Sequence, residues 1–493
     1  MRALRRVPKE SSECQRAPGH HHRADGGRTL HAGGGALRPW RECRRPFLLA
    51  WRGRLAPRDC ARRALQGSGY LSLRFYSEAT LHELVVYGER ISPPPPPPPP
   101  PPAAPRQPPL MRSFLGVNGF FDDPVSRLNA AGSMREYQDL VWTEGMPDAG
   151  WPHAANSFSP SYSQFDIDAE YVRLKNASID VHQCLQGRPW FMSKEANGTV
   201  NATTKGWKPV IDAMIHNLTA IVDPASYAAI AAHAYQVAAR YGTVKVAASN
   251  LQLAKGQPVR SGMDVLKHIE ILNEPDGWWA GREHFMKPFE IAAMLSAAYD
   301  GHERKISGAA TGVGVKNADP KMQVVMPGVT GTSKKNLDIV RMIRLWAQAA
   351  RKDRLFPADV LNFHGYSTDT KAEPDSARTP EQNNMQEGLR ELTAWRDANE
   401  PTLQVWLTEF GYDTSQGSTD RAVAYKSYTG DQVQAMWLVR GYMLAAAAKI
   451  DRAHIFMLRN VNDHGGQKFD TCGLTSAKST SGNRRSVGIT SRR

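Results

Sequence analysis

The stretch His268-Ile269-Glu270-Ile271-Leu272-Asn273-Glu274-Pro275 sets the interpretation of the whole chain. Its apolar residues predict a buried strand, and Pro275 terminates that strand. An ionisable side chain, Glu274, is therefore expected at the carboxyl end of a strand. In chains built of strands and helices, catalytic side chains gather at that end. Asn-Glu-Pro alone is a modest signal, and it gains weight if a second strand presents a second carboxylate.

Seven further segments share this strand-like texture, and helical spacing lies between most of them. In chain order, strands are predicted at 113–119, 134–141, 179–185, 268–272, 322–326, 359–363, 404–407 and 453–458. Helices are predicted at 165–175, 224–241, 288–299, 337–351, 386–398 and 431–450. Eight strands that alternate with helices predict an α/β fold, the (β/α)8 or TIM barrel.

The chain is expected to have three parts: a basic, polyproline-containing segment at 1–110, a barrel at 111–475 and an unstructured tail at 476–493. The tail is polar and aperiodic where a barrel expects its closing helix, so the last helix is expected to be missing or altered. The first segment contains ten consecutive prolines from Pro93 to Pro102, which favour a stiff polyproline II spacer. The segment is interpreted as disordered or as absent from the mature protein, with a transit peptide or a partner-binding tail as alternatives.

The charge distribution argues against a nucleic-acid-binding protein. The net charge is +14, but residues 1–110 carry +11 of it and the other 383 residues carry only +3. The five cysteines show no metal-ligand spacing, although a Cys184–Cys472 bridge is possible. No apolar run is long enough to span a membrane. Sequons at Asn176, Asn197, Asn201 and Asn217 make secretion plausible, yet no signal peptide is visible, and the localisation and oligomeric state stay open.

A second carboxylate follows the seventh predicted strand, at Glu409 in Thr408-Glu409-Phe410-Gly411. Side chains at the ends of strands four and seven of a barrel converge over one mouth. Two facing carboxylates are what glycoside cleavage requires, because one must hold a proton for the leaving oxygen while the other stays ionised to attack the anomeric carbon. Glu274 and Glu409 are therefore the candidate catalytic pair.

Three further polar residues are expected beside this pair. Strand six ends in His364-Gly365-Tyr366, at the level of the two carboxylates. A tyrosine hydroxyl such as that of Tyr366 would lower the pKa of a neighbouring carboxylate and fix its rotamer. Asn273 could hydrogen-bond a sugar 2-hydroxyl, a contact that strengthens in the transition state.

These motifs resemble those of glycoside hydrolase clan A, the retaining (β/α)8 glycosidases, over about residues 111–475. The layout is nearest to families 39 and 5. The resemblance implies that Glu274 is the acid/base and Glu409 the nucleophile, and that neither a metal nor an organic cofactor is needed. It also implies an arginine on strand two that touches the nucleophile, for which Arg135 is the candidate. Many clan members place a tryptophan at strand eight, where this chain has Leu458-Arg459.

Trp278, Trp279 and Arg459 complete the candidate substrate-binding set. The two indole rings follow Glu274 on its loop and could stack on sugar faces or pack within the loop. Arg459 could clamp a hydroxyl or an anionic sugar group, or pair with an acid of a neighbouring loop. The predicted activity is hydrolysis of β-linked oligo- or polysaccharides by a two-glutamate double displacement. The alternatives are a catalytically inactive sugar-binding barrel with a partner-docking Pro/Arg-rich tail, and a polyproline scaffold protein.

Overall fold

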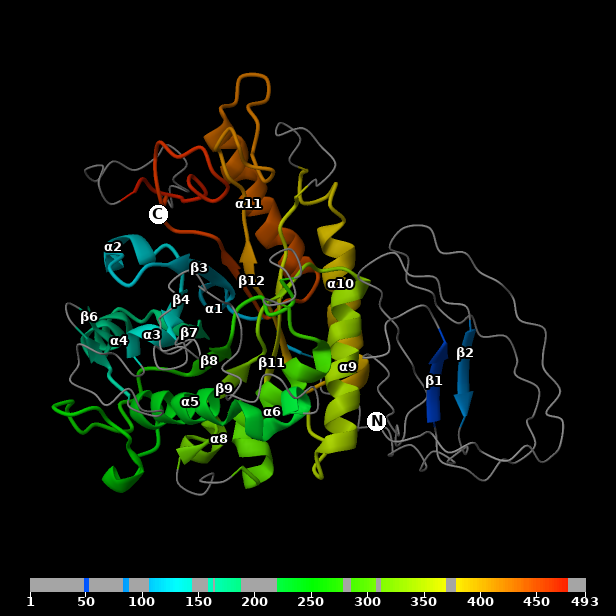
Figure 1. Ribbon diagram of the computed structural model, residues 1–493. Coiled ribbons are helices and arrows are strands. Elements are labelled where there is room, and N and C mark those ends of the chain that lie inside the picture. Colours follow the sequence, from blue (N-terminus) through cyan, green and yellow to red (C-terminus); the bar gives the residue numbers. More distant parts are fainter. Residues whose placement is uncertain are drawn as a thin grey trace, which may run out of the picture. The chain divides into compact units, whose positions relative to one another are not determined.

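The computed structural model describes residues 48–52, 83–87, 106–143, 158–162, 165–187, 220–277, 285–306, 312–368 and 378–477 (Figure 1). The chain divides into two units, 1–100 and 101–493. In the first unit, β1 (Leu48–Arg52) and β2 (Glu83–Tyr87) form an antiparallel pair. Apart from these two strands, residues 1–105 lie outside the described residues, and so does most of the segment expected to be disordered. Within the second unit, Arg106 Nη1 lies 3.1 Å from Oδ1 of Asp451.

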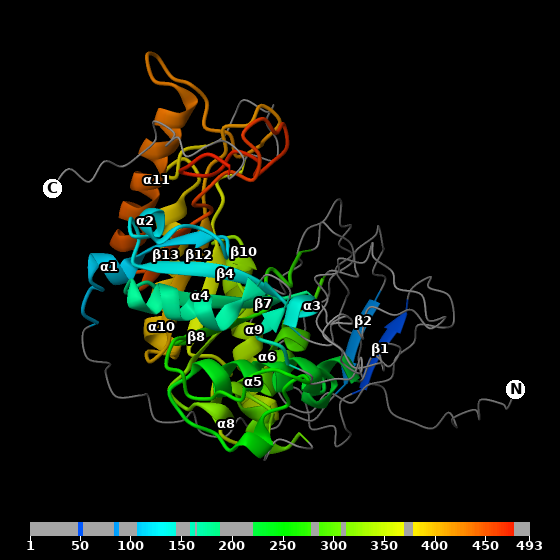
Figure 2. The same cartoon turned by 90° about the vertical axis from the view of Figure 1, so that its left-hand side faces the viewer.

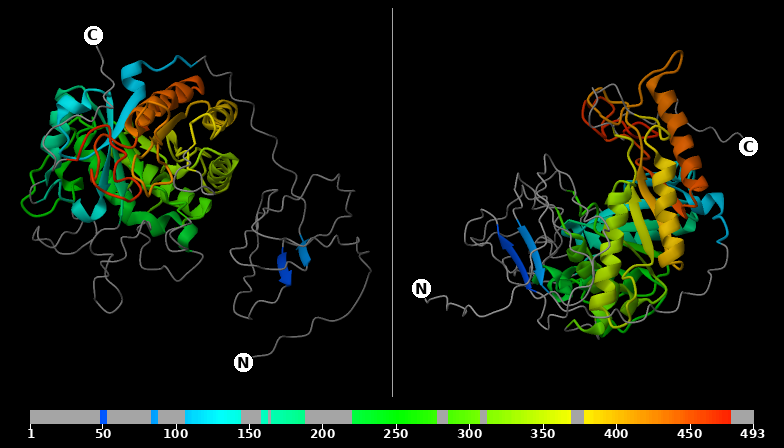
Figure 3. Two further views of the ribbon diagram at one scale, coloured as in Figure 1. Left: turned by 90° about the horizontal axis from the view of Figure 1, so that it is seen from above. Right: turned by 90° about the vertical axis from the view of Figure 1, so that its right-hand side faces the viewer.

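The second unit contains a closed barrel of eight parallel strands, which confirms the predicted (β/α)8 fold. The strands are β3 (Leu115–Gly119), β4 (Ser133–Asp139), β7 (Asp180–Gln186), β8 (His268–Ile271), β9 (Gln323–Val325), β11 (Val360–His364), β12 (Gln404–Phe410) and β13 (Arg452–Ile455). They pair in that order, and the barrel closes where β13 pairs with β3. The two-residue strand β10 (Val329–Thr330) adds a short pairing to β11. Seen from above, the elements follow one another around the barrel in chain order (Figure 3).

Most strand ends differ from the sequence-based prediction by one or two residues, and the two largest differences lie at carboxyl ends. β12 continues to Phe410, so Glu409 lies within the strand rather than after it. The prediction of a strand over 453–458 was wrong at its carboxyl end, because β13 stops at Ile455. Consequently Phe456, and not Leu458 or Arg459, is the first residue beyond strand eight. The registers of β11 with β12 and of β12 with β13 also shift near Glu409, which re-aims the side chains at that end of the barrel.

Helices surround the barrel at the predicted places, with local differences at their starts. The longer ones are α4 (Ile167–Asn176), α5 (Ala228–Tyr241), α6 (Pro288–Arg304), α9 (Lys334–Ala350), α10 (Met385–Asn399) and α11 (Gly430–Ala447). The short ones are α1 (Met111–Phe114), α2 (Val125–Leu128), α3 (Leu140–Thr143) and α8 (Val315–Ala318), with 3-10 turns at Ala220–Val222, Pro224–Tyr227 and Ala248–Asn250. The segment predicted as a helix over 165–175 begins instead with β6 (Phe165–Asp166), paired with β5 (Ser161–Tyr162).

Local sequence explains where several helices begin. Asp166 caps α4 by accepting a hydrogen bond from the Ala169 amide, and Thr429 caps α11 in the same way from Gln432. Asp223 accepts from the Ala225 amide, but the turn it caps is a 3-10 helix that precedes α5. The alanines of α5 and α6 are almost all fully buried, so small side chains let these two helices approach the barrel and each other closely.

No helix follows β13 within the residues described, up to Ala477. Loops occupy residues 456–477 instead, and α11 stands beside α10 and β13 (Figure 2). The tail at 478–493, which is predicted to be unstructured, lies outside the described residues. Among the described helices, none combines the length and the apolar character that crossing a membrane would require. Cys184 and Cys472 are both free thiols, so the possible bridge between them is not formed.

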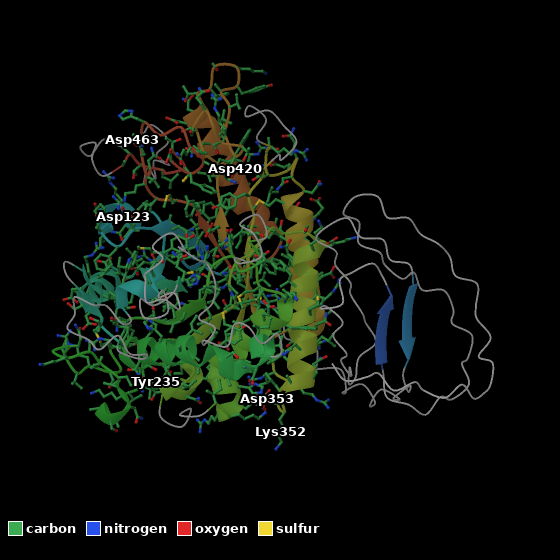
Figure 4. All side chains as sticks on the ribbon, in the orientation of Figure 1. Asp123, Tyr235, Lys352, Asp353, Asp420 and Asp463 are labelled. Carbon is green, nitrogen blue, oxygen red and sulfur yellow. The ribbon has the colours of Figure 1, made fainter. Side chains whose placement is uncertain are left out.

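The loops that follow the strands gather at one end of the barrel. Asp123, Asp420 and Asp463, which follow β3, β12 and β13, lie in the upper part of Figure 4. Lys352 and Asp353, which follow α9, lie at the bottom of the same view. The upper end is therefore the carboxyl-terminal mouth of the barrel, where catalytic residues are expected in this fold.

Candidate active site

Glu409 lies on β12 and is almost completely buried, with 4% of its surface exposed. Its Oε1 accepts hydrogen bonds from Arg135 Nη1 at 2.6 Å and from the Tyr137 hydroxyl. Its Oε2 accepts a hydrogen bond of 2.8 Å from the Tyr366 hydroxyl. Both oxygens are thus acceptors only, which is the hydrogen-bonding pattern of an ionised carboxylate.

Glu274 follows β8 in a conformation that few non-glycine residues adopt. Its φ is +41°, and Leu272 before it has φ +75°. The backbone is held there because the Glu274 amide donates to Gly328 O at 3.0 Å, and Asn273 bridges to the same glycine. This turn directs the carboxylate to His364, whose Nδ1 lies 2.6 Å from Glu274 Oε1. Such local strain is typical of functional sites.

The two carboxylates are near neighbours. Glu274, His364 and Glu409 each present an atom within 4.8 Å of the atoms presented by the other two. The imidazole lies between the carboxylates, because its Nε2 is also 3.6 Å from Glu409 Oε1. The structure therefore brings together two acids that come from strands four and seven of the barrel.

Their environments shift the two acids in opposite directions. Burial raises the pKa of Glu274, and the nearby charge of Glu409 adds to this, although His364 opposes it. Burial alone would also raise the pKa of Glu409, but His364, Arg135 and the hydrogen bonds from Tyr137 and Tyr366 outweigh it and lower that pKa. Paired acids with divergent pKa values can serve as one proton donor and one anion.

Arg135 connects this pair to the floor of the site. It is fully buried on β4 and reaches Asn118 Oδ1 at 3.0 Å and Asn273 Oδ1 at 2.7 Å in addition to Glu409. It also forms a bidentate pair with Glu270, at 2.7 and 2.9 Å. Asn118 in turn donates to the carbonyl oxygens of Thr408 and Ile455. One guanidinium thereby ties together strands one, two, four and seven of the barrel.

The sequence-predicted residues divide into three groups. Those that the structure gathers around the carboxylates are Asn273, His364, Tyr366 and Arg135. Trp278 and Trp279 lie outside the described residues. Arg459 is engaged elsewhere, since its Nε lies 2.8 Å from Asp123 Oδ1 and it also pairs with Asp122. Of the two roles considered for Arg459, the structure shows the pairing with loop acids.

Sequence reasoning missed several residues of this site. Tyr137 lies two residues after Arg135 on β4, so the alternation of a strand places it on the same inner face. Glu270 lies on β8, and the turn that carries Glu274 follows that strand. Asn118 is the penultimate residue of β3, and Phe456 follows β13 directly. The alternation signal could have found Tyr137, whereas Phe456 was hidden by the misplaced end of strand eight.

Phe456 and Phe469 form an aromatic wall with the two tyrosines. The ring centroid of Phe456 is 6.4 Å from that of Tyr137 and 6.5 Å from that of Tyr366. Phe469 lies 5.3 Å from both Phe456 and Tyr366. Both phenylalanines are only partly buried. Asp413 holds the loop, because its Oδ2 accepts a hydrogen bond from the Phe469 amide. Apolar ring surface is thus available beside the hydroxyls that contact Glu409.

Below the carboxylates, the barrel interior is filled by Trp406 and three histidines. The rings of His182, His268 and His454 lie 5.1, 4.9 and 6.3 Å from Trp406. Burial lowers the pKa of all three, to about 4 for His182. These three imidazoles are therefore neutral at physiological pH and add no positive charge beneath the carboxylates.

The group of Glu274, His364 and Glu409 is the only cluster of three metal-ligand side chains among the described residues. Its donor set fits a metal poorly. Glu409 already accepts hydrogen bonds on both oxygens, one of them from the guanidinium of Arg135. A cation would have to displace these donors and lie next to a permanent positive charge. The arrangement suits proton transfer and nucleophilic attack better.

Comparisons with known proteins reveal likeness in structure but not in sequence. No family sequence model and no curated protein sequence matches the chain. A glucosidase from Croceicoccus marinus matches with 16% identity and a TM-score of 0.44, over 75% of this chain and 64% of that one. A family 39 glycoside hydrolase from Bacteroides cellulosilyticus WH2 matches with 14% identity and a TM-score of 0.40, over 80% and 64%. An α-L-arabinofuranosidase from Thermotoga maritima matches with 12% identity and a TM-score of 0.38, over 72% and 58%.

All three matched proteins are glycosidases by their descriptions. The chain spans less than two thirds of the length of each of them. At such low identity the likeness concerns the fold alone, so the chemistry of this chain has to be argued from its own side chains.

Proposed function

We propose that the chain is a retaining glycoside hydrolase that cleaves β-linked oligo- or polysaccharides. The observation that carries the proposal is the pair Glu274 and Glu409, which lie close together at one barrel mouth with pKa values shifted in opposite directions. This is the division of labour that glycosidic bond cleavage requires. The placement on strands four and seven agrees with the roles that the resemblance to clan A implies.

In the first step, Glu274 donates its proton to the glycosidic oxygen while Glu409 attacks the anomeric carbon. The bond from that carbon to the leaving oxygen breaks, and a bond to the Glu409 carboxylate forms. In the second step, Glu274 is ionised and takes a proton from water. The water oxygen attacks the same carbon and releases Glu409, so the sugar leaves with its original anomeric configuration.

The short separation supports double displacement over direct displacement by water. Retaining glycosidases hold their two carboxyl groups about 5–5.5 Å apart, whereas inverting enzymes need about 6.5–9.5 Å to admit a water molecule. Oxygens of Glu274 and Glu409 lie within 4.8 Å of each other, which is below the separation that inverting enzymes need.

The neighbouring residues have supporting roles in this mechanism. Tyr137 and Tyr366 hold the Glu409 carboxylate in one rotamer, and Arg135 keeps it ionised. His364 orients Glu274 through its 2.6 Å contact. Asn273 lies beside both acids and is a candidate partner for the sugar 2-hydroxyl, with its own Oδ1 fixed by Arg135.

The test is a screen of the full chain on a panel of aryl β-glycosides and of plant and algal polysaccharides. For a substrate that is cleaved, Glu409→Gln should abolish turnover. Glu274→Ala should slow cleavage strongly and be partly rescued by azide on an activated substrate. Proton NMR of the first product should show the retained anomer. Asp168→Asn, which removes a buried carboxylate from an ion pair with Arg240, is the matched control and should keep activity.

Two outcomes would contradict the proposal. Full activity in both Glu409→Gln and Glu274→Ala would exclude these residues as the catalytic pair. Oligosaccharide binding without any release of reducing ends would identify the chain as an inactive sugar-binding barrel, the alternative reading of its sequence.

A further inference from the structure

Glu270 is a third carboxylate, linked to the proposed catalytic pair through Arg135. It lies on β8 and has no exposed surface. Its Oε2 accepts from Arg135 Nε at 2.7 Å and lies 3.0 Å from His182 Nε2. Its Oε1 accepts from Arg135 Nη2 at 2.9 Å and from the Gly328 amide at 3.0 Å. Such a set of donors fixes an ionised carboxylate.

The charges around Arg135 do not cancel pairwise. One guanidinium contacts two carboxylates, Glu270 and Glu409, and all three side chains are buried. With Glu409 alone, the arginine would neutralise the nucleophile, and these two groups together would carry no net charge. With Glu270 ionised as well, the three groups together carry a net charge of −1. Glu270 keeps its charge because Arg135 and His182 outweigh the effect of burial and hold its pKa well below the usual range.

This balance matters for glycoside cleavage, because positive charge develops at the anomeric carbon in the transition state. A preorganised negative potential stabilises that charge, and buried groups do so more strongly than groups in water. A nucleophile neutralised by an arginine would lose much of this effect. The bidentate contact to Glu270 therefore does more than hold Arg135 still.

We propose that Glu270 is a positioning residue that cancels the charge of Arg135, so that Glu409 keeps the negative potential required by the transition state. The inference rests on the proposed function and extends it to a residue that touches no substrate. This role and a purely structural role predict opposite changes in the pKa of Glu409 when Glu270 is replaced. If Glu270 only anchored Arg135, its loss would loosen the contact between Arg135 and Glu409, and the pKa of Glu409 would rise. If Glu270 balances charge, its loss lets Arg135 act on Glu409 alone, and that pKa falls.

The first experiment needs no substrate. The full chain is labelled with 13C at the glutamate carboxyls, and the Glu409 signal is identified by its loss in Glu409→Gln. Glu409 is then titrated in the wild type and in Glu270→Gln. The groups that face Glu409 are Arg135, Tyr137, His364, Tyr366 and Glu274. All of them are unchanged in this variant, in which the pKa of Glu409 should fall by about one unit. An unchanged or raised pKa would overturn the proposal.

Two further variants control for packing and folding. Asp168→Asn removes the carboxylate of another buried bidentate pair, with Arg240 at 2.7 and 2.6 Å, and should leave the titration of Glu409 as in the wild type. Glu270→Asp keeps the charge but shortens the side chain, so the pKa of Glu409 should stay near its wild-type value. A rise in Glu270→Asp would show that anchoring, and not charge, is the role of Glu270. This variant decides the question even if Glu270→Gln does not fold.

The second experiment measures catalysis on any aryl glycoside that the wild type cleaves. Glu270→Gln should lower kcat/KM about 10- to 100-fold, mainly through kcat, as is usual for residues that support a catalytic group. The acid limb of its pH profile should move to lower pH. An acid limb at the same pH in the variant and the wild type would contradict the proposal. If the wild type cleaves no glycoside, the proposed function fails, while the titration still decides whether Glu270 controls the charge of Glu409.

Discussion

The imidazole Nδ1 of His364 lies 2.6 Å from Oε1 of Glu274, and this contact couples the proton of the acid to a residue of another strand. Glu274 and Glu409 raise the pKa of His364 against the opposing effect of burial. In return, His364 lowers the pKa of both carboxyls. The pH dependence of the site is therefore a property of three groups together, and not of two acids alone.

Replacing His364 by alanine should move the whole pH profile of kcat/KM to higher pH. The acid limb reflects ionisation of Glu409 and the basic limb reflects loss of the proton from Glu274. Since His364 lowers both pKa values, both limbs should shift upward in its absence, and kcat/KM should fall about 10- to 100-fold. Initial rates over a pH series measure this. His233→Ala, on the outer helix α5, is the control, and limbs that stay in place in His364→Ala would contradict the coupling.

Tyr137→Phe and Tyr366→Phe should each raise the pKa of Glu409. Each substitution removes a hydroxyl that donates to a buried carboxylate, an interaction of about 1.5–3 kcal/mol. The acid limb of the pH profile should rise by about one unit while the basic limb changes little. Tyr235→Phe, on the outer helix α5 in the lower part of Figure 4, provides the comparison. A fall in rate without any movement of the acid limb would show that the hydroxyls act only on the sugar.

Phe469→Ala and Phe456→Ala should weaken substrate binding more than turnover. Their partly exposed rings lie beside Tyr366 and offer a flat apolar surface that matches the C–H face of a sugar ring. We expect KM to rise about tenfold in each case, with a smaller change in kcat. Phe456→Tyr keeps the ring and should bind as the wild type does. Loss of kcat at constant KM would instead place these rings in the support of Glu409.

Glu136→Gln should make the protein more stable at alkaline pH. Glu136 points away from Arg135 and Tyr137 on β4, and burial raises its pKa to about 8 despite an interaction with Tyr171. A carboxyl with a raised folded-state pKa contributes stability below its unfolded pKa of ~4.3, and this stability is lost as the pH rises through 8. The free energy of unfolding of the variant should therefore rise relative to that of the wild type between pH 5 and pH 9, by on the order of a few kcal/mol.

Urea unfolding at the two pH values measures the effect of Glu136→Gln. Glu391→Gln, at an exposed position of α10, serves as the control and should follow the wild type at both pH values. Parallel loss of stability in Glu136→Gln and the wild type would show that Glu136 is already ionised in the folded protein at pH 5.

The sequence predicted the barrel well because each strand is an apolar segment bounded by turn residues. Glu274 and Glu409 could be located for the same reason, since each follows or ends such a segment. His364, Tyr366 and Arg135 were also expected beside these acids, Arg135 only through a family resemblance, but the other contacts of Arg135 were not predicted. Arg135 meets Glu270 and Glu409 only because β4, β7, β8 and β12 pair in one particular register around a closed barrel. A single sequence does not contain that register.

Strand eight shows a second limit of the sequence. The segment Ala453-His454-Ile455-Phe456-Met457-Leu458 is apolar throughout, so its pattern does not mark where pairing stops. Pairing ends at Ile455, so Phe456 and not Arg459 is the first residue beyond strand eight at the mouth of the barrel. Helix starts were uncertain for a related reason, since Asp223 caps a 3-10 turn with the same side-chain chemistry that would cap an α-helix.

The buried pair of Arg135 and Glu270 also bears on how this protein could be engineered. Replacing a buried ion pair by well-packed apolar residues often leaves a protein as stable or makes it more stable. Selection for heat resistance alone would then favour apolar side chains at positions 135 and 270, while selection for turnover would retain the charges. Selection for heat tolerance and selection for catalytic rate would thus favour different side chains at the same two positions. Variants chosen in thermal screens should therefore be sequenced at these positions first.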